Sequence, residues 1–225
     1  MIHNLKEYCY RKFRTSFSKS GEDIMLYQLL KNSTRGCYID IGAHDPKIHS
    51  NSYFFYLRGW KGICVEPNPE YLSIWKSTRP KDVFLNCGVS MNNSVIDYYC
   101  FKDSVRNTFS KNYIEEFNLE EYVQKVIKIE TRPLNIILDE HNMENKHIGF
   151  ISIDAEGLDH DVIRSNDWNK YRPEFILIES FCSLKKDFEC DSLSYLDKFD
   201  YHLIGKIVQY DDGISTIGSL VFKRG

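Results

Sequence analysis

The chain has 225 residues, of which 42% are hydrophobic and 27% are charged, and its formal net charge is −3. This length and composition predict a single domain with a full apolar core, spanning residues 1–225. A pI near 6.2 argues against a dedicated nucleic-acid-binding protein.

The N-terminal segment and the cysteines indicate a cytoplasmic protein. No stretch approaches the ~20 apolar residues of a membrane span, and the first residues lack the apolar core of a signal peptide. Seven scattered cysteines without a Cys-x-x-Cys pair suggest reduced thiols. Residues 1–20 form a basic arm or helix, with five Lys or Arg residues against Glu7, a local excess of +4. A solvated first helix is favoured there over an arm that meets an anionic substrate or a membrane.

The first half of the chain alternates between predicted helices and strands. In order, we predict a capped amphipathic helix after residues 20–23, a strand at 36–41, a helix from Ser50 or Asn51 to Gly59, a strand at 62–66, a helix after the Asn68-Pro69 cap, a strand at 83–87 and an edge strand or hairpin arm at 95–101.

The second half continues this alternation. We predict a polar loop at 104–112, a helix at 133–141, a buried strand at 148–154, a helix at 158–165, a buried strand at 175–179, a helix at 193–199 and a closing antiparallel pair at 201–209 and 215–223. Strands that alternate with helices indicate an α/β fold, with a mostly parallel sheet and helices on both faces.

Four of the predicted strands end in a carboxylate: Asp40, Glu66, Asp154 and Glu179. Ligands in parallel sheets bind outside the carboxyl ends of the strands, so these acids are expected at one edge and around one cleft. Any one of them alone could be an ordinary loop residue.

The first strand-to-helix turn indicates the kind of cofactor. It has one early glycine, Gly42, and therefore lacks the Gly-x-Gly-x-x-Gly loop that binds a pyrophosphate. A cofactor with a ribose and no pyrophosphate fits better, and S-adenosylmethionine is the candidate. Glu66 would accept the ribose hydroxyls. The remaining candidate cofactor-binding residues lie beside it or at the other strand ends: Asp40, Ala43, His44, Pro67, Asn86, Cys87 and Asp154.

The segment around Asp154 supplies the candidate catalytic groups. A buried strand delivers Asp154, Glu156 and Gly157 into the same cleft, and His160 follows on the next helix. A carboxylate or an imidazole can accept a proton from a substrate hydroxyl. Asp154 and Glu179 could also ligate Mg²⁺. Acids at the start of a helix are the structural alternative for Glu156.

An ordered series of short motifs resembles the FkbM-type S-adenosylmethionine-dependent methyltransferases. The series runs from about Ser20 to Glu179 and comprises residues 20–23, 40–43, 50–52, 59–62, 65–67, 79–80, 154–157, 167–168, 172–173 and 178–179. The resemblance implies a Rossmann-like class I methyltransferase fold, with a seven-stranded sheet and a C-terminal antiparallel hairpin. It also implies O-methylation. Where the family commonly has Asn after Gly-Ala, this chain has His44.

These observations predict methyl transfer from S-adenosylmethionine to a hydroxyl of a saccharide or a sugar-linked metabolite. A small molecule or a glycan is then the partner, and nucleic acid is not. Two alternatives stay open. One is a nicotinamide-dependent dehydrogenase, and the other is a non-catalytic S-adenosylmethionine-binding module in a glycan pathway.

Overall fold

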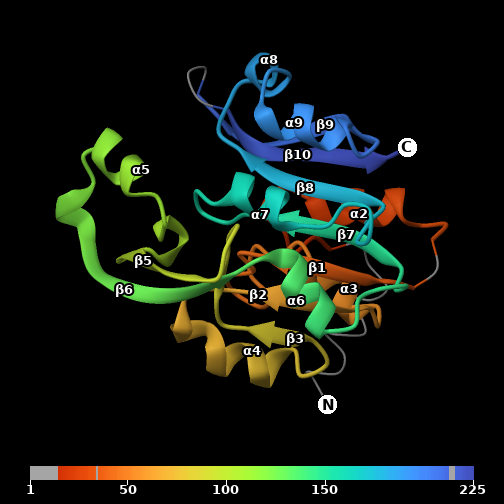
Figure 1. Ribbon diagram of the computed structural model, residues 1–225, viewed down its shortest axis with the longest axis horizontal. Helices are drawn as coiled ribbons and strands as arrows, with labels where there is room; N and C mark the ends of the chain where they lie inside the picture. The colour runs from red at the N-terminus through yellow and green to blue at the C-terminus, as the bar shows by residue number, and fades with distance from the viewer. Residues whose placement is uncertain (1–14, 34, 213–215) are drawn as a thin grey trace.

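The computed structural model describes residues 15–33, 35–212 and 216–225. Most of the predicted basic arm, residues 1–14, lies outside this part of the chain. Within it, seven strands form one sheet in the order β3-β2-β1-β7-β8-β10-β9, with the arrangement seen in Figure 1. The strands are β1 (Cys37–Ile41), β2 (Lys61–Val65), β3 (Val83–Leu85), β7 (Ile148–Ile153), β8 (Phe175–Ser180), β9 (Tyr201–Asp211) and β10 (Thr216–Arg224).

Strands β3, β2, β1, β7 and β8 run parallel, and β10 pairs antiparallel with both β8 and β9. This is the sheet of class I methyltransferases, so the predicted fold class and its C-terminal hairpin are confirmed. The prediction of a single domain over the whole chain stays a prediction. None of the described helices is both long enough and apolar enough to span a membrane.

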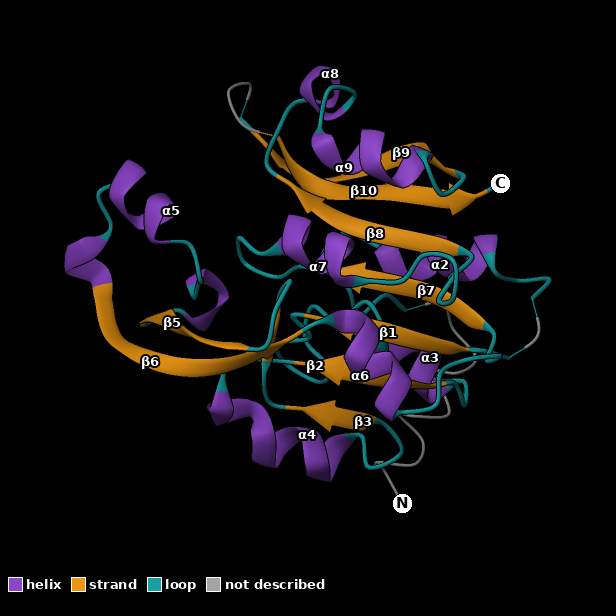
Figure 2. Ribbon diagram, viewed as in Figure 1, coloured by secondary structure: helices purple, strands orange, loops and turns teal. Residues whose placement is uncertain are grey.

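Helices cover both faces of the sheet, as Figure 2 shows. One face packs against α6 (Leu134–Glu140), α7 (Asp159–Ser165) and α9 (Asp191–Asp197), and the other against α2 (Glu22–Leu29), α3 (Tyr53–Leu57) and α4 (Leu72–Thr78). The side chains of β1 explain why. Ile39 and Ile41 enter the first core, and Tyr38 enters the second. A strand covered on both faces must be apolar almost throughout, which makes buried Asp40 exceptional.

A second, three-stranded sheet stands beside the main one, in the order β4-β6-β5. It consists of β4 (Gly88–Val89), β5 (Ser94–Phe101) and β6 (Val123–Arg132), and the chain between β5 and β6 carries the 3-10 helices η2 (Ser104–Arg106) and η3 (Glu120–Tyr122) and the helix α5 (Lys111–Glu116). The antiparallel β5–β6 pair confirms the hairpin arm predicted at 95–101. Neither β6 nor α5 was predicted, and the predicted strand 83–87 ends at Leu85.

The first described helix begins differently from the prediction. The N-cap of α2 is Gly21 at φ 93°, and no side chain caps the helix. Instead, the buried carboxylates of Glu22 and Asp23 turn back to the preceding chain. Glu22 Oε2 accepts the Ser20 N–H at 2.9 Å, and Asp23 Oδ2 accepts the Phe17 N–H at 2.7 Å. These bonds hold residues 17–20 against the start of α2. A short helix, α8 (Leu184–Asp187), also lay outside the predicted elements.

Candidate functional site

The carboxyl ends of β1, β2, β7 and β8 open into one cavity, which encloses about 1070 Å³, part of it open to solvent. Ten of the twelve predicted site residues line it: Asp40, Gly42, Ala43, His44, Glu66, Pro67, Cys87, Asp154, Glu156 and Glu179. The four acids predicted at strand ends therefore do meet around one space, as the parallel topology requires.

Gly42 permits the closest approach of two strands at this edge. It adopts φ +76°, and a Cβ placed on it would lie 1.6 Å from the Asp154 carbonyl oxygen. Its N–H and that of Ala43 both donate to the Val65 carbonyl, at 2.9 and 3.0 Å. No side chain fits here, so the glycine joins the ends of β1, β2 and β7 into one floor.

Glu66 is a buried carboxylate with one hydrogen bond on each oxygen. Oε2 accepts the His44 N–H at 2.8 Å, and Oε1 accepts the Asn68 N–H at 2.7 Å. Burial raises the pKa of Glu66 to about 7, although these two bonds oppose the shift. A carboxylate oxygen can accept more than one hydrogen bond, so both oxygens keep capacity for a pair of hydroxyl donors.

His44 joins the first loop to two other segments. Its Nε2 lies 2.7 Å from the Tyr71 hydroxyl and 3.0 Å from Ser104 Oγ, and these two oxygens are 2.9 Å apart. His44 adopts φ +42°, and burial lowers the pKa of its imidazole. The histidine is thus engaged with η1 (Pro69–Tyr71) and η2, and it fastens the β5–β6 arm at the rim of the cavity.

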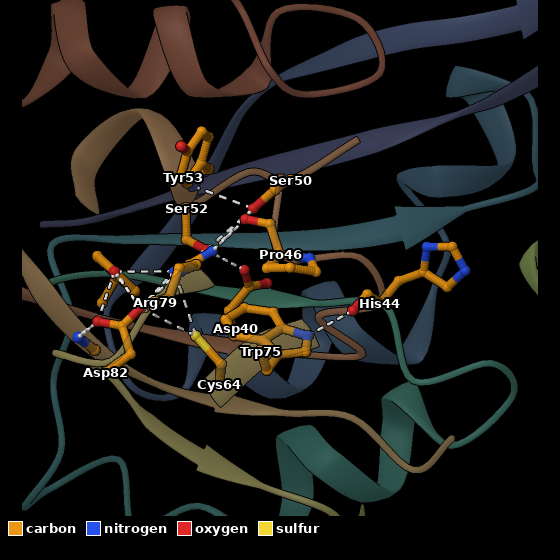
Figure 3. A network of polar contacts seen from close by, with 12 residues as sticks. Asp40, His44, Pro46, Ser50, Ser52, Tyr53, Cys64, Trp75, Arg79 and Asp82 are labelled. Carbon is orange, nitrogen blue, oxygen red and sulfur yellow. Dashed lines mark hydrogen bonds and ion pairs between the residues drawn. The ribbon is translucent and has the colours of Figure 1, made fainter. Parts of the chain in front are cut away.

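Asp40 is oriented by a buried network centred on Arg79, drawn in Figure 3. Arg79 is 1% exposed. Its Nη2 donates to Ser52 Oγ at 2.9 Å, and the Ser52 hydroxyl donates to Asp40 Oδ2. Burial raises the pKa of Asp40, and Ser52 and Arg79 oppose that shift.

The same arginine also holds the loop after Gly42. Arg79 Nη1 donates to the Pro46 carbonyl and to Ser50 Oγ, both at 3.2 Å, while Trp75 Nε1 donates to the His44 carbonyl at 2.7 Å. Figure 3 shows these contacts converging on the loop from α4 and the residue that follows it. The loop that carries the candidate cofactor residues is therefore fixed by a buried cation and an indole. The sequence carried no signal for this role of Arg79.

Asp154 and Glu179 lie side by side because Ile153 pairs with Ile178. Their carboxyl groups are hydrogen-bonded to each other. Burial is the first cause that raises both pKa values, and Glu179 is raised further, so Glu179 holds the shared proton and Asp154 ionises first. Burial also raises the pKa of Glu156, whose backbone stands at φ +53°.

The predicted magnesium site is not supported. Among the described residues, no group of three or more His, Cys, Asp or Glu side chains is arranged to hold a metal ion.

Two predicted site residues do not line the cavity. His160 lies in the first turn of α7, and the structure does not bring it to the acids. The Asn86 amide donates to the Glu66 and Pro67 carbonyls at 2.8 and 3.0 Å. It supports the end of β2 instead of facing the cavity.

Several residues that line the cavity were not predicted. Tyr98 and Phe109 come from the β5–β6 arm, with ring centroids 4.6 Å apart. Lys19, Gln209 and Ser219 come from the two ends of the chain. Their positions depend on long-range pairing, so no local pattern could have found them.

Comparisons with known proteins gave one family match and a set of distantly similar solved structures. No curated protein matches the sequence. Among solved structures, a 1,6-didemethyltoxoflavin-N1-methyltransferase from Burkholderia thailandensis is 9% identical, with a TM-score of 0.47 over 92% of this chain and 78% of that one. A precorrin-6y C5,15-methyltransferase from Geobacter metallireducens is 10% identical, with a TM-score of 0.42 over 90% and 86%.

A tRNA methyltransferase from B. subtilis is 14% identical, with a TM-score of 0.44 over 93% of this chain and 68% of that one. At such identities and TM-scores, none of the three indicates an acceptor for this chain. The sequence itself gives the stronger match. Residues 40–206, well over half of the chain, match the profile of the Methyltransferase FkbM domain. The chain therefore belongs to the FkbM methyltransferase domain family.

Proposed function

We propose that the protein transfers a methyl group from S-adenosylmethionine to a hydroxyl of a saccharide or a sugar-linked metabolite. The observation that carries the proposal is the shared cavity. It joins the Gly42 turn and Glu66, which suit a nucleoside, to Asp154, Glu156 and Glu179, which suit a hydroxyl. Membership of the FkbM methyltransferase family supports the same reaction class.

The residues of the first half fit the cofactor. Glu66 has spare acceptor capacity on both oxygens, which matches the two ribose hydroxyls. Gly42 and Ala43 line the part of the cavity where the amino-acid end would lie, and Cys87 and Gly88 line the part nearest β3, where the adenine would lie. When bound, S-adenosylmethionine supplies a methyl group that its sulfonium has already activated.

The charge of the cavity supports a neutral acceptor. Among the described residues that line it, five are carboxylic acids and one, Lys19, is a strong base: the acids are Asp40, Glu66, Asp154, Glu156 and Glu179. Glu179 holds a proton, and those of the acids that are ionised attract a cationic sulfonium and repel phosphates. A neutral hydroxyl compound is the acceptor class that such a cavity favours.

In this proposal, Asp154 is the proton acceptor. An alcohol is a weak nucleophile at neutral pH, so its proton must leave as the new carbon–oxygen bond forms. Glu179 donates a hydrogen bond to Asp154 and thereby fixes the carboxylate that ionises first. The product is a methyl ether, and the hydroxyl proton ends on Asp154.

The alternatives are separable by binding and turnover. A nicotinamide-dependent dehydrogenase would need a pyrophosphate loop, and the turn at Gly42 has only one early glycine. Isothermal calorimetry with S-adenosylhomocysteine and with NAD tests this choice. We expect S-adenosylhomocysteine to bind and NAD not to bind, and tight NAD binding would overturn the proposal. A non-catalytic binding module would bind S-adenosylhomocysteine and transfer no methyl group.

A further inference from the structure

One buried hydrogen-bond acceptor on a residue that lines the cavity lacks a partner. In the described part of the chain, Gln209 Oε1 is shielded from solvent and accepts no hydrogen bond. A buried acceptor without a donor is costly, and such atoms are uncommon in folded proteins. Gln209 itself lines the cavity, where a ligand would meet its side chain.

The orientation of the Gln209 amide is fixed by its neighbours. Its Nε2 donates to Glu22 Oε1 at 2.9 Å and to Ser219 Oγ at 3.3 Å. Glu22 is fully buried, and an ionised carboxylate can only accept hydrogen bonds, so the amide nitrogen must face it. The amide oxygen therefore points away from Glu22 as a held acceptor.

Gln209 belongs to the end of the cavity opposite Gly42 and Glu66. Ser219 on β10 pairs with Glu179 on β8, and β9 brings Gln209 alongside Ser219. Lys19 lines the same end and acts electrostatically on Asp154 and Glu179. Lys19, Gln209 and Ser219 all lie outside the residues 40–206 that match the family profile. These three residues therefore extend the cavity beyond the segment that matches the family profile.

We propose that this end is the acceptor subsite, where the Asp154 carboxylate receives the hydroxyl to be methylated and Gln209 Oε1 receives a second hydroxyl of the same neutral polyol. The inference rests on the proposed methyl transfer and adds the residue that selects the acceptor. Lys19 disfavours a cationic amine here, and the acids disfavour a phosphorylated sugar. A site built to hydrogen-bond a hydroxyl rejects analogues that lack it, because its own polar atom is then left unpaired.

Saturation-transfer NMR on the protein saturated with S-adenosylhomocysteine tests the subsite. The probes are neutral methyl hexopyranosides and the corresponding hexose phosphates. We expect at least one methyl hexopyranoside to bind, more tightly than its phosphate. Gln209→Met should weaken its binding about tenfold or more, since the side-chain length is kept and the amide oxygen is lost. The matched control is Gln124→Met, which makes the same change at an exposed position of β6.

Calorimetry with S-adenosylhomocysteine and thermal unfolding are measured on each variant. Unchanged cofactor binding in Gln209→Met shows that the fold and the other half of the cavity are intact. A second arm needs no variant: on the wild-type protein, removing single hydroxyls from the bound hexopyranoside should weaken binding about tenfold at two positions.

Binding of no hexopyranoside, or equal binding by wild type and Gln209→Met, overturns the subsite while cofactor binding stands. Tolerance of every single deoxygenation overturns it as well. Failure of the wild-type protein to bind S-adenosylhomocysteine would instead overturn the proposed function.

Discussion

The affinity for S-adenosylhomocysteine should depend on pH through Glu66. Burial raises its pKa to about 7. An ionised carboxylate accepts hydroxyl hydrogen bonds about twice as strongly as a neutral group, so the cofactor favours the ionised form. Protonation then competes with binding, and the affinity falls as the pH drops below the pKa. Between pH 8 and pH 5.5 the ionised fraction falls about 30-fold, which is up to about 2 kcal/mol of binding free energy.

Glu66→Gln isolates this effect from the other acids of the cavity. The variant should bind S-adenosylhomocysteine at least tenfold more weakly at pH 8. Its affinity should also vary less with pH, because the number of protons released on binding falls by about one. Asp154 also titrates near this range, since its pKa is raised to about 6, but it is unchanged in the variant. Glu116→Gln, at an exposed position of α5, is the control that should leave affinity and slope unaltered.

The assay is isothermal calorimetry from pH 5.5 to pH 8.5 in pairs of buffers that differ in ionisation enthalpy. The wild-type protein should release close to one proton on binding near pH 6, and Glu66→Gln should release less. A wild-type affinity that is flat over this range would refute the assignment of Glu66 to the ribose. An identical pH slope in wild type and Glu66→Gln would do the same.

Three further predictions concern the floor and the acids of the site. Gly42→Ala should lower the free energy of unfolding by about 3 kcal/mol or more, because its Cβ would collide with the Asp154 carbonyl oxygen. In the control Gly205→Ala a Cβ meets nothing within 4 Å, so the free energy of unfolding should change by no more than about 0.5 kcal/mol. Equal denaturation midpoints for the two variants would contradict this. Asp154→Asn should slow single-turnover methyl transfer by ~10² while cofactor affinity stays nearly intact, and His160→Ala should leave the transfer rate unchanged. A slow His160→Ala variant and a fast Asp154→Asn variant would instead identify His160 on α7 as the base. Exhaustive chelation should leave turnover unchanged, and recovery of a lost rate by added Mg²⁺ would show that Asp154 and Glu179 do hold a cation.

The strand ends were predictable because a parallel sheet gathers them at one edge. Four apolar runs end at or near a carboxylate, which predicts four acids around one cavity. All four line the cavity: Asp40, Glu66, Asp154 and Glu179. The closing antiparallel pair was predictable for a related reason, since alternation and a turn lie close together in sequence.

Other parts could not be predicted because their signals are not local. Strand β6 is an exception, because Ile127, Ile129 and Thr131 alternate with exposed Lys128 and Glu130, and this local strand signal was missed. Arg79 belongs to one of the motifs that carry the family resemblance, but no local pattern indicates that it is the centre of a buried network. The position of Gln209 depends on hydrogen bonds to Glu22, which lies far from it in sequence, and to Ser219 on the neighbouring strand β10. His160 was predicted from proximity in sequence, and it lies in the first turn of α7, outside the set of residues that line the cavity.

The central claim is that the cavity transfers a methyl group to a hydroxyl. The most direct measurement incubates the protein with S-adenosylmethionine carrying a ¹³C-labelled methyl and with neutral hexopyranosides, followed by mass spectrometry and ¹³C NMR of the products. The account predicts a singly methylated hexopyranoside with the label bonded to oxygen, formed by wild type and lost in Asp154→Asn. Label found only on nitrogen or carbon of an added acceptor, or no transfer by a protein that binds S-adenosylhomocysteine, would contradict it.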